Sequence, residues 1–84
     1  MRCLIVEDDP VLATQLDRAM TDGGFACDIA GDGTQGEYLG ATESYDLAIL
    51  DLGLPGLPGI EVLTHWREGG VTMPVLILTA RGDW

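Results

Sequence analysis

CLIVEDDP, residues 3–10, is the stretch that decides the fold, and LAILD, residues 47–51, repeats its plan. Each is a short apolar run that closes on carboxylates, the pattern of a fully buried parallel strand. In an open parallel sheet, ligands bind just beyond the carboxyl ends of the strands. At about 5 Å and an effective dielectric of about 20, two carboxylates repel each other by about 3 kcal/mol. We therefore expect a divalent cation to bind where these acids meet.

Working outward, the rest of the chain alternates strands with helices. Asp9-Pro10 predicts an N-cap followed by proline at the first helical position, and Asp22-Gly23-Gly24 ends that helix. The alternation favours βαβ units, and hence an α/β fold with a parallel sheet. We expect strands at Arg2–Val6, Phe25–Ala30, Tyr45–Leu50 and Val75–Thr79, and helices at Pro10–Asp22, about Thr34–Thr42 and about Gly59–Glu68.

Two details of these helices are open to test. Gly36 and Gly40 lie inside the second predicted helix and lower its intrinsic helix propensity. The third predicted helix is expected to turn Ile60, Leu63 and Val62 toward the sheet.

Length and composition exclude several classes of protein. The 84 residues allow one small domain. The net charge of −10 disfavours direct binding to nucleic acid or to an anionic membrane surface. The apolar runs are too short to span a bilayer, and the N-terminus lacks the layout of a signal peptide, so a cytoplasmic location is expected. Cys3 and Cys27 either face each other on neighbouring strands or, as we favour, are two small buried thiols.

Asp51 stands alone at the end of its strand, before a loop rich in glycine and proline. A carboxylate in such a place can act as a nucleophile toward phosphorus and form an aspartyl-phosphate. That chemistry needs a hard cation such as Mg²⁺, which takes oxygen ligands. Glu7 and Asp8 would supply charge from the adjacent strand and would bind the cation together with Asp51. The backbone carbonyl of Gly53 would complete the ligand set. Thr79 would place a hydroxyl near the phosphoryl group.

Each of these residues also has a purely structural interpretation. Asp9 is better explained as a helix cap, and Glu7 or Asp8 alone would be a solvated strand end. Asp51 alone would be a turn former, and Thr79 alone a β-branched strand residue. Their order favours a site: an acidic pair after the first strand, a lone Asp after the third and a Thr after the fourth.

Three motifs resemble a known family. LIVEDDP, residues 4–10, is similar to the opening of receiver domains of two-component response regulators. DLGLPG, residues 51–56, with GIEVL, residues 59–63, looks like their phosphoacceptor loop and third helix. PVLILTAR, residues 74–81, matches their fourth strand. The sequences of the three motifs are most similar to those of the OmpR-type subfamily of transcription factors.

The resemblance implies a flavodoxin-like (CheY-like) doubly wound sheet of order 2-1-3-4(-5). It makes Asp51 the phosphorylated aspartate, Asp8 a direct Mg²⁺ ligand and Glu7 a ligand acting through water. Gly53 becomes the carbonyl donor and Thr79 the switch hydroxyl. It also implies a sensor histidine kinase as partner, no turnover of an external substrate, and a transcriptional output through a C-terminal domain that would carry the DNA contacts.

Residues 1–84 are expected to be the N-terminal part of such a domain, because the fifth strand, its lysine and the last helices have no counterpart. A chain of this length is expected to pair through the Val75–Thr79 edge, or to exchange an element with a second copy. One alternative function is a non-phosphorylated interaction module or folding fragment. Another is an aspartyl-phosphate phosphatase, which Gly53 disfavours because such enzymes carry a second aspartate there.

Overall fold

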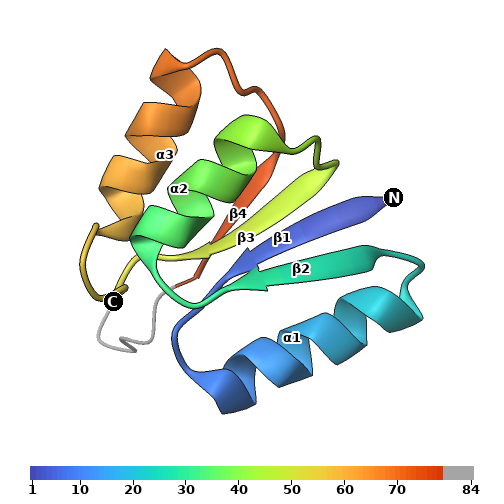
Figure 1. The fold of residues 1–84 in the computed structure, drawn as a ribbon. Helices are drawn as coiled ribbons and strands as arrows, with labels where there is room; N and C mark the ends of the chain where they lie inside the picture. The colour runs from blue at the N-terminus through green and yellow to red at the C-terminus, as the bar shows by residue number, and fades with distance from the viewer. Residues whose placement is uncertain (79–84) are drawn as a thin grey trace.

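The structure is a computed structural model that describes residues 1–78, a four-stranded parallel sheet between two helical layers (Figure 1). The strand order is β2-β1-β3-β4, which confirms the predicted doubly wound, receiver-like sheet. Helix α1 covers one face, and α2 and α3 cover the other (Figure 1). The elements are β1 Arg2–Val6, α1 Pro10–Asp22, β2 Ala26–Ala30, α2 Gly33–Thr42, β3 Leu47–Asp51, α3 Gly59–Glu68 and β4 Val75–Leu78.

The third strand begins two residues later than predicted and extends to Asp51 itself. Tyr45 is drawn out of the strand, because its hydroxyl donates to Asp28 Oδ2 at 2.8 Å and its ring lies under the Arg2 guanidinium. Asp46 accepts a hydrogen bond from the Arg2 backbone N–H at 2.8 Å. These long-range contacts hold the segment before β3 against the start of β1.

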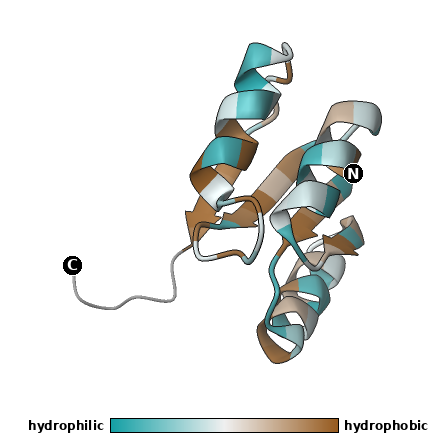
Figure 2. Ribbon diagram, turned by 60° about the vertical axis from the view of Figure 1, so that its left-hand side comes forward, coloured by the Kyte–Doolittle hydropathy of each residue, from teal (hydrophilic) through white to brown (hydrophobic). Residues whose placement is uncertain are grey.

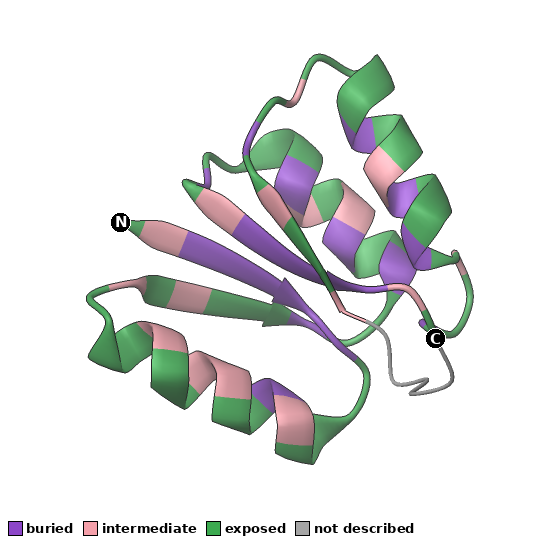
Figure 3. Ribbon diagram, turned by 180° about the vertical axis from the view of Figure 1, so that it is seen from behind, coloured by how far each residue is buried: buried purple, intermediate pink, exposed green. Residues whose placement is uncertain are grey.

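The sheet separates two apolar clusters, which Figure 2 shows as brown strands between helices with polar outer faces. Cys3, Ile5 and Ile49 form the core under α1. The other face carries the larger cluster, in which Trp66 of α3 is almost fully buried. The two central strands are buried along most of their length, as Figure 3 shows, whereas β2 and β4 are edge strands.

The sequence prediction for α3 is partly wrong. Val62 is buried and Leu63 half-buried, but Ile60 is 57% exposed. The buried pair Val62 and Trp66 lies four residues apart on one side of the helix, which places Ile60 on the far side.

Helix α2 packs unusually closely, and its glycines are the reason. A Cβ built on Gly36 would lie 2.6 Å from Cγ1 of Val6, and one on Gly40 would lie 2.6 Å from Cζ2 of Trp66. Both distances are shorter than any ordinary carbon contact. The two glycines therefore allow α2 to approach the sheet and α3, which offsets their low helix propensity.

Polar contacts fix the helix ends and join the outer helices. Asp9 caps α1 by accepting from the Val11 and Leu12 N–H groups, and Asp32 caps α2 by accepting from Gln35 N–H. Nδ1 of His65 in α3 lies 3.1 Å from a Glu37 carboxylate oxygen of α2. This ion pair is exposed, so its contribution to stability is small.

Strand β4 is paired only with β3 among the described residues. Its side chains Leu76 and Ile77 are 53% and 39% exposed. Within residues 1–78, no helix combines the length and apolar character needed to cross a bilayer.

Candidate functional site

The site lies at the carboxyl edge of the sheet, where β1 and β3 run side by side. Their parallel register pairs Val6 with Leu50, so the residues that follow each strand emerge together. Glu7 is held there because its N–H donates to the Ala30 carbonyl at 3.0 Å, which extends the pairing of β1 with β2 by one residue. Asp51 is the last residue of β3.

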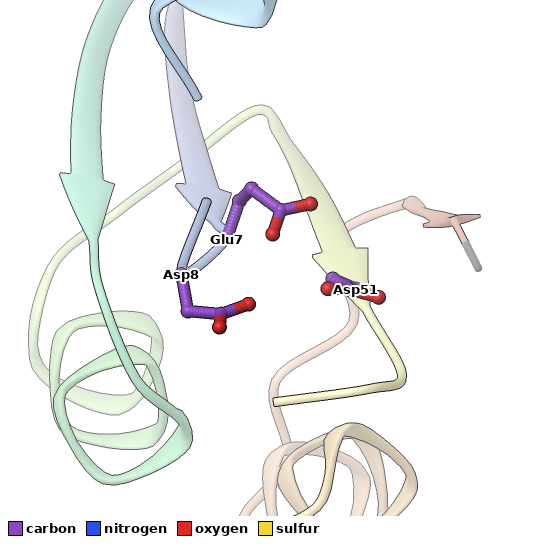
Figure 4. A group of neighbouring side chains, drawn as sticks. All are labelled: Glu7, Asp8 and Asp51. Atoms are coloured by element: carbon purple, nitrogen blue, oxygen red, sulfur yellow. The ribbon is translucent and has the colours of Figure 1, made fainter. Parts of the chain in front are cut away.

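Three carboxylates converge at this edge. One oxygen each from Glu7, Asp8 and Asp51 lies within 4.8 Å of the other two. Figure 4 shows the three side chains directed toward a common point between the ends of β1 and β3. Glu7 and Asp51 are each only 4% exposed, whereas Asp8 faces solvent. The cluster is therefore negatively charged, buried at Glu7 and Asp51, and accessible to solvent at Asp8.

The environment of Glu7 shows the electrostatic cost of this arrangement. Burial, together with the neighbouring Asp51 and Asp8 carboxylates, raises the pKa of Glu7 to about 7. The Asp9 N–H opposes this pKa shift by donating to Glu7 Oε2 at 3.1 Å. Below pH 7 a proton on Glu7 relieves part of the repulsion between the carboxylates. A divalent cation would relieve it at any pH at which the three groups are ionised.

The loop after β3 orients Asp51. The Gly53 N–H donates to Asp51 Oδ1 at 3.0 Å, and the Gly59 N–H donates to the Leu52 carbonyl at 3.4 Å. Gly59 sits so close to β3 that an added Cβ would lie 2.8 Å from Cα of Leu52. Gly56 turns the loop at φ +73°, a region that favours glycine. The loop is thus tied back beneath the strand end and fixes the carboxylate.

The sequence-predicted residues have different outcomes. The structure brings Glu7, Asp8 and Asp51 together, and it makes Asp9 a cap. Gly53 contacts Asp51 through its N–H, a contact that the sequence did not indicate, and its carbonyl role stays a prediction. Thr79 lies outside the described residues.

The donor set suits Mg²⁺. All three side-chain donors are hard carboxylate oxygens, and no thiol or imidazole belongs to the cluster. Mg²⁺ usually takes one or two carboxylates, together with water and phosphate oxygens. The exposed side next to Asp8 is where such oxygens could enter.

Comparison with known proteins supplies the family. Residues 3–84 match the response regulator receiver domain. The chain is 46% identical over 81 residues to the transcriptional regulatory protein TctD of Salmonella typhimurium, covering 96% of this chain and 36% of TctD. It is 47% identical over 81 residues to the transcriptional regulatory protein PmrA of Pectobacterium parmentieri, with the same coverage of each chain. These relatives are regulators of the OmpR family.

A solved structure agrees with the fold. The response regulator TrrA of Thermotoga maritima, in complex with Mg²⁺ and BeF, matches with a TM-score of 0.90 and 31% identity. The match covers 96% of this chain and 70% of TrrA. The chain thus spans little more than a third of its curated relatives and about two thirds of this receiver structure.

Proposed function

The chain belongs to the response regulator receiver family, and we propose that Asp51 accepts a phosphoryl group from a partner histidine kinase. The observation that carries this proposal is the meeting of Glu7, Asp8 and Asp51 at the carboxyl edge of the sheet. Of the three carboxylates, Asp51 alone comes from the end of β3, and the following loop orients its side chain, as a nucleophile requires.

The geometry of the three carboxylates supports the proposal, and the individual roles are those that the family resemblance implies. An Asp51 carboxylate oxygen attacks phosphorus, so that an O–P bond forms while the P–N bond of the donor phosphohistidine breaks. The Gly53 N–H holds the other side of the carboxylate in place. Asp8 would hold Mg²⁺ as a direct ligand and Glu7 through water, and Asp51 and the Gly53 carbonyl would complete the ligand set. When bound, Mg²⁺ would neutralise charge on the transferred phosphoryl oxygens. Thr79 is proposed as the switch hydroxyl.

The wider setting is also part of the proposal. Residues 1–84 would be the N-terminal part of a receiver domain in a cytoplasmic regulator that catalyses only its own phosphoryl chemistry. DNA contact would come from an output domain elsewhere in the protein. The net charge of −10 supports this division, because the segment itself is a poor ligand for phosphate backbones.

A beryllofluoride titration tests the proposal. In the natural protein with Mg²⁺, beryllofluoride should bind Asp51 as a phosphoryl mimic and shift the Gly53 amide resonance strongly, since that N–H contacts Asp51. Asp51→Asn should remove the response, whereas Asp32→Asn, at the cap of α2, should keep it. An unshifted Gly53 amide at saturating Mg²⁺ and beryllofluoride would favour the non-phosphorylated interaction module.

Metal binding should depend most on Asp8. We expect Asp8→Ala to weaken Mg²⁺ binding at least tenfold, and Glu7→Ala to weaken it no more than Asp8→Ala does. Removing a direct ligand lowers the affinity for Mg²⁺ more than removing a ligand that acts through water. Isothermal titration measures both affinities. Asp22→Ala removes the same charge from the exposed end of α1 and serves as control. Unchanged affinity in Asp8→Ala would rule out its role as a ligand.

A purified 84-residue polypeptide should associate through β4. The exposed apolar edge of Val75–Leu78 is a template for pairing with a second copy, so sedimentation should show dimers or larger species at micromolar concentration. Leu76→Lys should reduce this association, whereas Ile29→Lys on the opposite edge strand should not. A cooperatively folded monomer would refute this prediction.

A further inference from the structure

Two thiols that take no part in the acidic site lie opposite each other beneath α1. Cys3 of β1 and Cys27 of β2 are direct partners in the parallel register, so both side chains point to the same face of the sheet. Both belong to the apolar cluster under α1, and both are free thiols. They are close enough for each to affect the pKa of the other.

The spacing of the strands suits a covalent link. Neighbouring strands lie about 4.8 Å apart, and the Cα atoms of a disulfide are about 4.4–6.8 Å apart. The register therefore brings the two residues within reach with no change in pairing. We propose that Cys3 and Cys27 form a reversible intramolecular disulfide when the protein is exposed to a hydroperoxide.

The two thiols differ in access, which sets the order of events. Cys27 is half-buried on the edge strand β2, with its Sγ 4.0 Å from the Thr21 hydroxyl and 4.0 Å from the Asp17 carbonyl at the rim of α1. Cys3 is fully buried behind it. An oxidant therefore reaches Cys27 first, and Cys3 is the resolving thiol.

The chemistry balances in two steps. The Cys27 thiolate attacks one peroxide oxygen; an S–O bond forms, the O–O bond breaks, and the released hydroxide takes up a proton to become water. The Cys3 sulfur then attacks the Cys27 sulfur, an S–S bond forms, the S–O bond breaks, and a second water leaves. Two thiols are oxidised and one hydrogen peroxide is reduced to two waters. A dithiol reductant reverses the link by exchange.

The surroundings make this a slow reaction. Burial raises the pKa of Cys3 to about 12 and also raises the pKa of Cys27, so both are protonated at neutral pH. Thiolates are the reactive form, hence brief exposure to peroxide leaves the pair reduced and sustained exposure closes it. Transient disulfides of this kind are compatible with a reducing compartment.

A closed bond would act on the fold as well as on the thiols. It joins residues 24 positions apart and encloses all of α1 in one loop. Such a loop restricts the unfolded chain, and we expect the thermal midpoint to rise by about 10 °C. The edge strand β2, which pairs only with β1 among the described residues, would be fastened to its neighbour.

Peptide mapping tests the proposal without any mutation. The reduced natural protein is incubated with hydrogen peroxide, alkylated and digested with trypsin, which cuts after Arg2, Arg18 and Arg67 and places the two cysteines on separate peptides, 3–18 and 19–67. We expect these peptides to appear linked, two hydrogens lighter than their sum, and to separate after reduction. Free alkylated cysteines, or Cys27 oxidised to sulfinic acid without a linked peptide, would overturn the inference.

Single variants give a second measurement. In Cys3→Ser, Cys27 should accumulate as sulfenic acid that a dimedone probe traps, and the peroxide-induced rise in thermal midpoint should vanish. In Cys27→Ser, the buried Cys3 should stay a free thiol under the same treatment. Equal peroxide labelling of Cys3 and Cys27 in the two variants would contradict the proposed order.

Discussion

Asp51→Asn is expected to abolish the hydroxylamine-sensitive phosphoryl label of the natural protein when a phosphodonor and Mg²⁺ are supplied. The amide is close in shape to the carboxylate and can still accept from Gly53, so the loop after β3 should keep its conformation. Only the nucleophile is lost. Labelling with radioactive phosphodonor, followed by hydroxylamine treatment, measures the acyl phosphate directly.

Two further variants test whether the loss of phosphoryl label in Asp51→Asn comes from the loss of the nucleophile. Asp8→Asn keeps the nucleophile but weakens metal binding, so its labelling should recover in part at high Mg²⁺, whereas that of Asp51→Asn should not. Asp46→Asn, at the opposite end of the sheet, should label normally. Wild-type labelling of Asp51→Asn would show that another acid accepts the phosphoryl group.

The order of strands and helices could be predicted because it depends on local pattern. Buried parallel strands appear as unbroken apolar runs, and the cap at Asp9 directly precedes its helix. The start of β3 could not be predicted, because Tyr45 is held by residues of β1 and β2 that are distant in sequence. The orientation of Ile60 was predicted wrongly because α3 is short. An apolar residue in the first turn of a short helix is compatible with either the buried or the exposed side.

The acidic cluster was predictable for a topological reason. Adjacent parallel strands end at the same edge, so acids that close β1 and β3 must meet. The amide contact of Gly53 was not predictable, since it depends on backbone dihedral angles in a loop that has no periodic pattern. The close packing of α2 could not be predicted either. A glycine inside a helical segment looks the same in the sequence whether it only lowers helix propensity or also allows another element to pack closely against the helix.

Trp66 should have the largest effect of any core residue on stability. Its ring is 1% exposed, packs against Gly40, and donates from Nε1 to the Glu37 carbonyl at 3.2 Å, so it joins α3 to α2. We expect Trp66→Ala to lower the free energy of unfolding by about 3–5 kcal/mol, measured by urea denaturation. Because a whole domain is stable by only about 5–15 kcal/mol, this loss would remove a large share of the free energy of unfolding.

A double-mutant cycle with Gly40 separates packing from helix propensity. Gly40→Ala should cost about 1–3 kcal/mol in the wild-type background, because the new methyl group meets the buried Trp66 ring. In the smaller Trp66→Leu background the same change should become neutral or stabilising by up to about 1 kcal/mol, since alanine then contributes only its better helix propensity. A coupling energy near zero would mean that Gly40 is not kept small by Trp66.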